Sequence, residues 1–206
     1  MRKAVILGAA VAALLSWVNP VQATSLVQLN TVQLVDVSDT VIRGNVSEVW
    51  TERDQGGLIW THAQIEISDV FKGDAGIESI IVEQPGGTWG SHTTRVAGVA
   101  RFSVGEDAYF FINHNSAGQA RLTGMLQGKF NVQMDPYSQL EIVHRFSVAP
   151  EKAFDHRFLP LPPDSRRTSA DEFENTLETA VLEGWDGQPI PGISFEHLQR
   201  VNAEVK

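Results

Sequence analysis

The chain contains no cysteine, and only three methionines and two tyrosines occur among its 206 residues. Without cysteine, an exported domain has neither a disulfide framework nor a thiol nucleophile, so a hydrophobic core has to stabilise the fold. The sequence also lacks a Gly-x-Ser-x-Gly segment and a Gly-Lys-Ser/Thr phosphate loop. These absences exclude the commonest sequence signatures of hydrolases and of nucleotide-binding proteins.

Long apolar runs are missing too, apart from one at the start of the chain. Residues 1–23 begin with Arg2 and Lys3, continue with an apolar run over residues 4–18 and end in small residues up to Ala23. This three-part layout predicts a signal peptide that is cleaved after Ala23. The run of about 15 residues is shorter than the roughly 20 that a membrane-spanning helix needs. We therefore expect a periplasmic or secreted protein with no transmembrane segment after signal removal.

Basic residues are scarce relative to acidic ones. The chain has 16 Lys and Arg against 25 Asp and Glu, and its formal net charge is −9. Nucleic acids and anionic lipids bind surfaces rich in Lys and Arg. The composition therefore argues against a nucleic-acid partner and against an anionic membrane surface.

The segment after the signal peptide has β-strand character. Its clearest strand runs from Ile59 to Ser68, where Ile59, Thr61, Ala63, Ile65 and Ile67 alternate with Trp60, His62, Gln64, Glu66 and Ser68. A period of two predicts one buried face and one wet face, with His62 on the wet face. We expect a long loop over residues 88–103 and one bent strand over residues 121–134.

The sequence after residue 146 changes in composition. Residues 147–167 are rich in proline and charge, which is typical of an extended linker. Ser169 to Glu172 form a capping box that predicts a helix ending near Gly184, and a second helix is predicted after Ser194. We divide the chain into a signal peptide (1–23), a barrel domain (24–146), a proline-rich linker (147–167) and a helical C-terminal segment (168–206).

The fold class that these elements favour is mainly β. Five or six short strands with glycine bends suit a small OB-like antiparallel barrel, closed so that no strand edge stays open, with a helical C-terminal tail. An immunoglobulin-like sandwich is the alternative, although it would prefer about seven strands and regular turns.

Catalytic and metal-binding constellations are not visible in the sequence. Its six histidines, which are His62, His92, His114, His144, His156 and His197, never occur at the spacing that points two ligands at one metal. The neighbouring acids Glu106 and Asp107 point to opposite faces of a strand, and we interpret them as a solvated turn. The sequence predicts a protein that is not an enzyme, with no metal and no cofactor.

Tryptophans in strands and loops are a more useful signal. Trp60 lies on the predicted wet face, and Trp89 lies in the predicted loop that begins near Gly86 and Gly87. Aromatic side chains on a polar face suit a binding surface, and OB barrels bind oligosaccharides through one face and its loops. These four residues are therefore the candidate site for a glycan or a lipid. A structural envelope component remains a further alternative.

Four short segments in a fixed order resemble the netrin-like OB-fold module, and within it the tissue inhibitors of metalloproteinases. They are Ser38-Asp39-Thr40-Val41-Ile42-Arg43, Phe71-Lys72-Gly73 and Gln84-Pro85-Gly86-Gly87, followed by Glu106-Asp107-Ala108-Tyr109-Phe110. The resemblance covers roughly residues 24 to 134. It implies an OB-type barrel that binds an extracytoplasmic protein.

The same resemblance implies a mechanism at the mature N-terminus. In those inhibitors the α-amine and the first carbonyl oxygen chelate the zinc of a metalloprotease, and the second residue enters the specificity pocket. Cleavage after Ala23 would assign these roles to Thr24 and Ser25. The family fastens its N-terminus with cysteines, which this chain lacks, so Leu26, Leu29 and Leu34 would have to hold the segment against the barrel.

Overall fold

The computed structural model describes residues 26–27, 29–145, 153–154 and 167–184. The predicted signal peptide, Thr24, Ser25, most of the predicted linker and the predicted second C-terminal helix lie outside the described residues. Within the described part, no helix is both long and apolar enough to cross a membrane.

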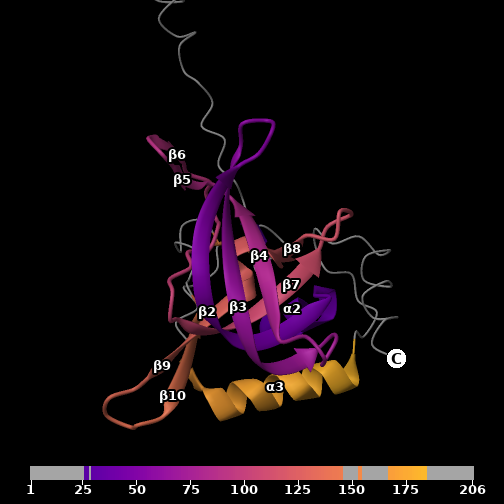
Figure 1. The fold of residues 1–206 in the computed structure, drawn as a ribbon. Helices are drawn as coiled ribbons and strands as arrows, with labels where there is room; N and C mark the ends of the chain where they lie inside the picture. Colours follow the sequence, from indigo (N-terminus) through magenta and orange to yellow (C-terminus); the bar gives the residue numbers. More distant parts are fainter. Residues whose placement is uncertain (1–25, 28, 146–152, 155–166, 185–206) are drawn as a thin grey trace, which may run out of the picture.

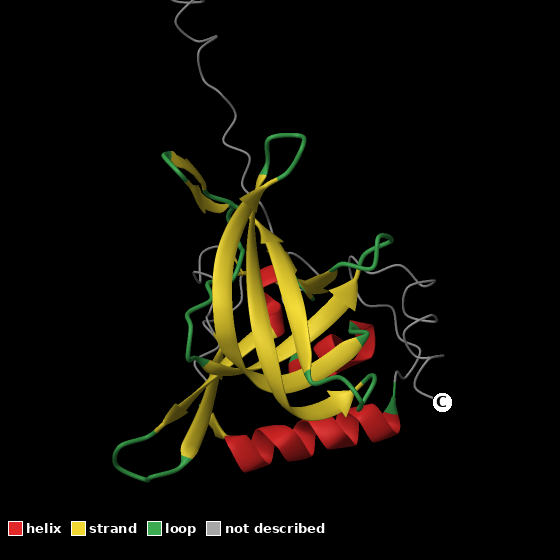
Figure 2. Ribbon diagram, viewed as in Figure 1, coloured by secondary structure: helices red, strands yellow, loops and turns green. Residues whose placement is uncertain are grey.

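Five strands form a closed ring (Figures 1 and 2). They are β2 (Thr40–Arg53), β3 (Ile59–Lys72), β4 (Ser79–Pro85), β7 (Asp107–His114) and β8 (Ala120–Leu122). They pair in the order β7-β2-β3-β4-β8, and β8 pairs with β7 to close the ring. Every pair is antiparallel except β4–β8, where Val82 lies opposite Ala120 in a parallel contact. The predicted OB-like barrel is confirmed, because a sandwich would keep two separate sheets.

Shorter elements extend this ring. The ring sheet continues from β7 through β9 (Lys129–Met134), β10 (Glu141–Arg145) and β12 (Thr168–Ser169). Two-stranded sheets are formed by β5 (Gly87–Trp89) with β6 (His92–Thr94), and by β1 (Leu26–Val27) with β11 (Ala153–Phe154). The helices are α2 (Thr31–Val37), the 3₁₀ helix η1 (Met125–Gly128) and α3 (Ala170–Glu183).

Two predicted segments differ from the structure. The predicted loop 88–103 contains the β5–β6 hairpin, which its glycine-spaced sequence concealed. The predicted bent strand 121–134 is three elements, because the backbone at Gly124 turns into the left-handed region (φ 62°) and η1 follows. The chain does bend within this segment, but the bend is sharp enough to end the strand.

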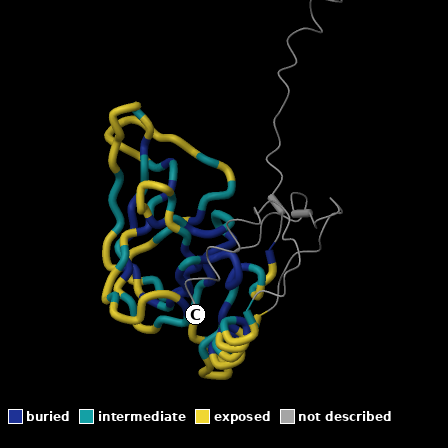
Figure 3. The backbone as a smooth tube through the Cα atoms, turned by 90° about the vertical axis from the view of Figure 1, so that its right-hand side faces the viewer, coloured by how far each residue is buried: buried dark blue, intermediate teal, exposed yellow. Residues whose placement is uncertain are grey.

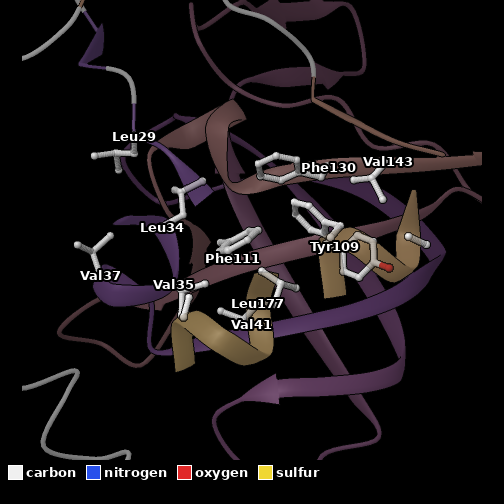
Figure 4. Packing of buried hydrophobic residues seen from close by; sticks show 13 residues of the cluster. Leu29, Leu34, Val35, Val37, Val41, Tyr109, Phe111, Phe130, Val143 and Leu177 are labelled. Carbon is white, nitrogen blue, oxygen red and sulfur yellow. The ribbon is translucent and has the colours of Figure 1, made fainter. Parts of the chain in front are cut away.

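The central strand β7 is buried on both faces. Ala108, Phe110 and Ile112 point into the ring, whereas Tyr109 and Phe111 point to the outer side, and all five are fully buried. Strand residues alternate between faces, so an unbroken apolar run requires cover on both sides. The outer cover comes from α2, α3, β9 and β10, and their side chains pack with Tyr109 and Phe111 in a second core (Figure 4).

Helix α3 begins and ends where the sequence predicts. The Ser169 hydroxyl accepts a hydrogen bond from the Glu172 N–H, and Gly184 follows the last turn with a φ of 67°. Phe173 and Leu177 face the second core, while the opposite side of the helix is exposed (Figure 3). The helix thus covers the second core on the outer side of the barrel.

A half-buried ion cluster ties α3 to the strands. The Arg43 guanidinium on β2 contacts Asp107 at 2.6 Å, Glu141 at 2.7 Å and Glu174 at 3.4 Å. The hydrogen bonds that Arg43 donates to the Asp107 carboxylate raise the pKa of Arg43 further above its usual range. Burial, and then the hydrogen bond that the Tyr109 hydroxyl donates to Glu174 at 2.5 Å, raise the pKa of Tyr109. The cluster joins four elements, namely β2, β7, β10 and α3.

Lys72 on β3 binds the C-terminal end of α2. Its Nζ donates to the Val35 carbonyl oxygen at 2.8 Å, and its side chain is almost completely buried. Burial lowers the pKa of Lys72 to about 8, while the nearby carboxylates of Asp36 and Asp39 act in the opposite direction. The buried cation adds a second, shorter hydrogen bond to a carbonyl in the last turn of α2, which also accepts the Ser38 N–H at 3.4 Å.

Gly44 on β2 allows a close approach of two strands. The pairing of β2 with β3 shifts in register between Arg43 and Gly44, as at a β-bulge. A Cβ atom at this position would lie 2.4 Å from the Glu66 carbonyl oxygen and 2.7 Å from Ile65 Cγ2.

We expect Gly44→Ala to lower the free energy of unfolding by roughly 2–3 kcal/mol, because β3 would have to move away from β2. Urea denaturation measures this change. Gly76→Ala is the control, because its Cβ would meet only the movable Asp74 side chain. An equal loss in both variants would contradict the close approach.

Lys72 also predicts a pH dependence of stability. The folded state releases the proton near pH 8, whereas the unfolded state keeps it up to about pH 10.4. The unfolded state therefore binds more protons in between, and the stability of the wild type rises with pH. Between pH 7 and pH 9.5, we expect the free energy of unfolding of the wild type to rise by about 2 kcal/mol relative to that of Lys72→Met. Parallel profiles of unfolding free energy against pH would contradict this assignment.

Candidate functional site

A pocket with a volume of about 450 Å³ opens beside the β5–β6 hairpin. It lies between the end of β4, the hairpin and the segment 95–103, and we call it the loop pocket. Its lining combines the hydroxyl side chains of Thr94 and Ser103 with the apolar side chains of Val96 and Phe102. A volume of this size falls in the range of small-molecule sites, which is about 300–1,000 Å³.

Gly86 and Gly87 form one wall of the loop pocket. Their φ angles of 96° and 130° lie in the region that L side chains rarely adopt. A Cβ at Gly87 would lie 2.5 Å from the Thr61 hydroxyl oxygen, and one at Gly86 would lie 2.9 Å from the Thr94 carbonyl oxygen. The two glycines therefore let the chain leave β4 and pass close to β3 and β6.

The segment 95–103 is fastened at three backbone carbonyls, those of Gly98, Ala100 and Arg101. The respective donors are the Leu126 N–H (2.9 Å), the Gln84 side-chain amide and Lys129 Nζ (2.6 Å). Burial lowers the pKa of Lys129, while its contact with Glu106 at 2.5 Å favours the charged form. The far wall of the loop pocket is thus held by core elements.

This arrangement corrects the interpretation of Glu106 and Asp107. They do point in different directions, as predicted, but they are not a solvated turn. Glu106 binds Lys129 beneath the segment 95–103, and Asp107 binds Arg43 in the ion cluster. Lys129 is buried and Arg43 is partly buried. The sequence did not reveal these cationic partners, because they lie far from the two carboxylates in the chain.

Trp89 lies on the tip of the β5–β6 hairpin, next to the turn between β2 and β3. The two tips are at the same end of the barrel (Figure 1), where the Thr51 hydroxyl donates to the Thr88 carbonyl oxygen at 2.6 Å. Trp89 is 44% exposed, and the Arg53 guanidinium lies 5.8 Å from its ring centroid. Leu58 in the neighbouring turn is 60% exposed. We call Arg53, Leu58 and Trp89 the hairpin-tip surface.

Trp60 belongs to another surface. Its indole N–H donates to Asp54 at 3.0 Å, and the Arg121 guanidinium covers its ring at 4.2 Å. Its neighbour Thr61 faces the loop pocket, and neighbours on a strand point to opposite faces. The structure therefore brings Gly86 and Gly87 together in the pocket wall, places Trp89 beside them and separates Trp60 from all three.

His62, predicted on a wet face, is buried. It stacks on Trp50 with ring centroids 5.1 Å apart, and its ring nitrogens lie 3.7 Å from Glu83 and 3.9 Å from Glu52. The prediction was wrong because alternation locates the outward face but not what covers it. Trp50, which pairs with His62 across β2 and β3, covers the histidine ring.

The N-terminal segment is anchored to the barrel from Leu29 onward. Leu29 is 4% exposed, its N–H donates to the Gln127 side-chain oxygen at 2.9 Å, and its carbonyl accepts from Arg145 at 2.8 Å. The Asn30 side chain then caps α2, and Leu34 is fully buried. Leu29 and Leu34 therefore pack as the cysteine-free anchor requires, whereas the side chain of Leu26 lies outside the described residues.

Potential metal ligands do not cluster in the part of the chain that the structure describes. The described residues contain no group of three His, Asp or Glu side chains close enough to hold a metal ion. Sequence reasoning missed Leu58, Arg95 and Arg101, although all three belong to the surfaces described above. Their loops carry turn residues, but no spacing in the sequence indicates which loops meet.

Comparisons with protein-family models and with curated proteins found no match. The resemblance to the netrin-like module therefore stays a prediction.

Proposed function

We propose that this protein is an exported, non-enzymatic binding module that holds another protein at its hairpin-tip surface. The observation that carries the proposal is the pairing of an exposed tryptophan with an arginine at the end of a closed barrel. The Arg53 guanidinium carbon lies 5.8 Å from the centroid of the Trp89 ring, and Leu58 adds an exposed apolar side chain in the neighbouring turn. Tryptophan and arginine are the residue types that most often dominate protein interfaces.

Hydrogen bonds hold the residues of the hairpin-tip surface in place. The Arg53 guanidinium donates to the Gly57 carbonyl oxygen at 3.1 Å, which holds it across its own turn. The Thr51–Thr88 hydrogen bond joins the two hairpins. A side chain held in place before binding loses less conformational entropy in the complex. The loops at the end of an OB barrel are also where this architecture receives ligands.

We expect a photo-crosslinking residue at position 58 or 89 to join the exported protein to one partner polypeptide. Position 182 on α3 is the control, because Leu182 is 86% exposed but belongs to another surface. For the partner so identified, Trp89→Ala should weaken binding roughly thirtyfold, since a tryptophan at such a position contributes about 2 kcal/mol. Equal crosslinking from position 182, or unchanged affinity of Trp89→Ala, would refute the proposal.

A second candidate function is inhibition of a zinc metalloprotease through Thr24 and Ser25. The anchoring of Leu29 favours it, because hydrogen bonds and burial at this residue do what cysteines do in the netrin-like inhibitors. An anchor at Leu29 limits the conformational entropy that binding through Thr24 can cost, because only the five residues 24–28 precede it and each contributes at most about 1–2 kcal/mol. A catalytic zinc keeps one coordination position open for an amine or carbonyl ligand.

The free α-amine of Thr24 can be tested directly. A protein that begins at Thr24 should inhibit a matrixin-type protease, whereas a protein with one additional N-terminal residue should lose nearly all inhibition, because its amine is displaced from the metal. Inhibition of peptide hydrolysis measures both. Equal inhibition by the two proteins, or none by either, would end the chelation hypothesis and leave the hairpin-tip proposal standing.

A further inference from the structure

The loop pocket collects positive charge in an acidic protein. Its charged lining residues are two arginines, Arg95 and Arg101, and no described carboxylate lines it. The chain as a whole has a formal charge of −9. Both arginines are exposed, and an anion in the pocket would be attracted by both charges.

Neither guanidinium group forms a hydrogen bond or an ion pair with another described residue. The contrast with other arginines of the barrel is clear: Arg43 binds Asp107 at 2.6 Å and Arg145 donates to Leu29 at 2.8 Å. Guanidinium presents five donors in a planar fork that fits the two oxygens of a carboxylate. Arg95 and Arg101 therefore have donor capacity directed at no group of the described chain.

We propose that the loop pocket binds a sugar unit that carries a carboxylate, such as a hexuronate. Arg95 and Arg101 hold the carboxylate, the Thr94 and Ser103 hydroxyls bind ring hydroxyls, and Phe102 contacts the apolar face of the ring. This ligand site does not rest on the hairpin-tip surface, which consists of other residues.

The size and composition of the pocket favour a sugar over a simple oxyanion. Its volume is about 450 Å³, whereas a water molecule occupies about 30 Å³ and a sulfate ion only a few times as much. A sugar ring fills more of this space and offers both polar and apolar groups. The lining has the same mixture, because it includes Thr94 and Ser103 as well as Val96, Val99 and Phe102.

The pocket is also prepared for a ligand before it binds. The segment that carries both arginines is fastened at Gly98, Ala100 and Arg101, and the opposite wall is fixed where Thr61 donates to the Gly86 carbonyl oxygen at 2.7 Å. Walls held by the core keep their spacing, so little binding energy is lost to ordering the site.

Titration of the isotope-labelled protein with D-glucuronate tests the proposal. We expect saturable NMR shifts at the Gly86 and Gly87 amides, and none with D-glucose, which has the same ring without the carboxylate. The same titration is repeated with sodium sulfate, a simple oxyanion, and with N-acetyl-aspartate, a carboxylate that is not a sugar. Saturable shifts at these amides with glucose, or equally strong ones with sulfate or N-acetyl-aspartate, would overturn the assignment to an acidic sugar, as would no saturable shift with glucuronate.

Variants then test the role of the arginines. Arg95→Ala and Arg101→Ala should each weaken glucuronate binding roughly tenfold, the effect of losing one charge-assisted hydrogen-bond pair. The matched control is Arg167→Ala, an exposed arginine outside the pocket, which should bind as the wild type does. Unchanged binding in both pocket variants would refute the proposal. If a variant fails to fold, the comparison of glucose with glucuronate on the wild type still decides it.

Discussion

The burial of β7 on both faces is the constraint on which the rest of this structure depends. One side of the strand fills the ring with Ala108, Phe110 and Ile112, and the other side supplies Tyr109 and Phe111 to the second core. Without disulfides, these two cores must offset the conformational entropy of the chain. Helices α2 and α3 are needed because they cover Tyr109 and Phe111, which would otherwise lie in water.

Charge is used in two different ways in this barrel. Arg43 and Lys129 lie beneath the surface, where carboxylates from distant segments pair with them, and removal of either partner would leave a poorly solvated charge. Arg95 and Arg101 lie at the surface of a pocket and have no such partner within the described residues. Ion pairs of the first kind hold elements together, whereas arginines of the second kind remain able to bind a ligand.

The OB-like ring explains why the candidate surfaces lie at one end. Strands β2 and β3 are 14 residues long, so their turn extends beyond the shorter strands of the ring. Gly86 and Gly87 then direct the chain from β4 toward this turn, where β5 and β6 form the neighbouring hairpin. The hairpin-tip surface and the loop pocket are therefore two consequences of the same change in chain direction.

Local patterns in the sequence determined the elements that depend on neighbouring residues. The alternation from Ile59 to Ser68 indicated a strand, and Ser169 and Gly184 marked the ends of α3. Only the tertiary structure decided that Trp50 covers His62, that Lys129 pairs with Glu106, and that Trp60 and Trp89 lie on different surfaces. The reason is physical: strand period and helix caps arise from contacts a few residues apart, whereas burial and charge pairing arise when distant segments pack together.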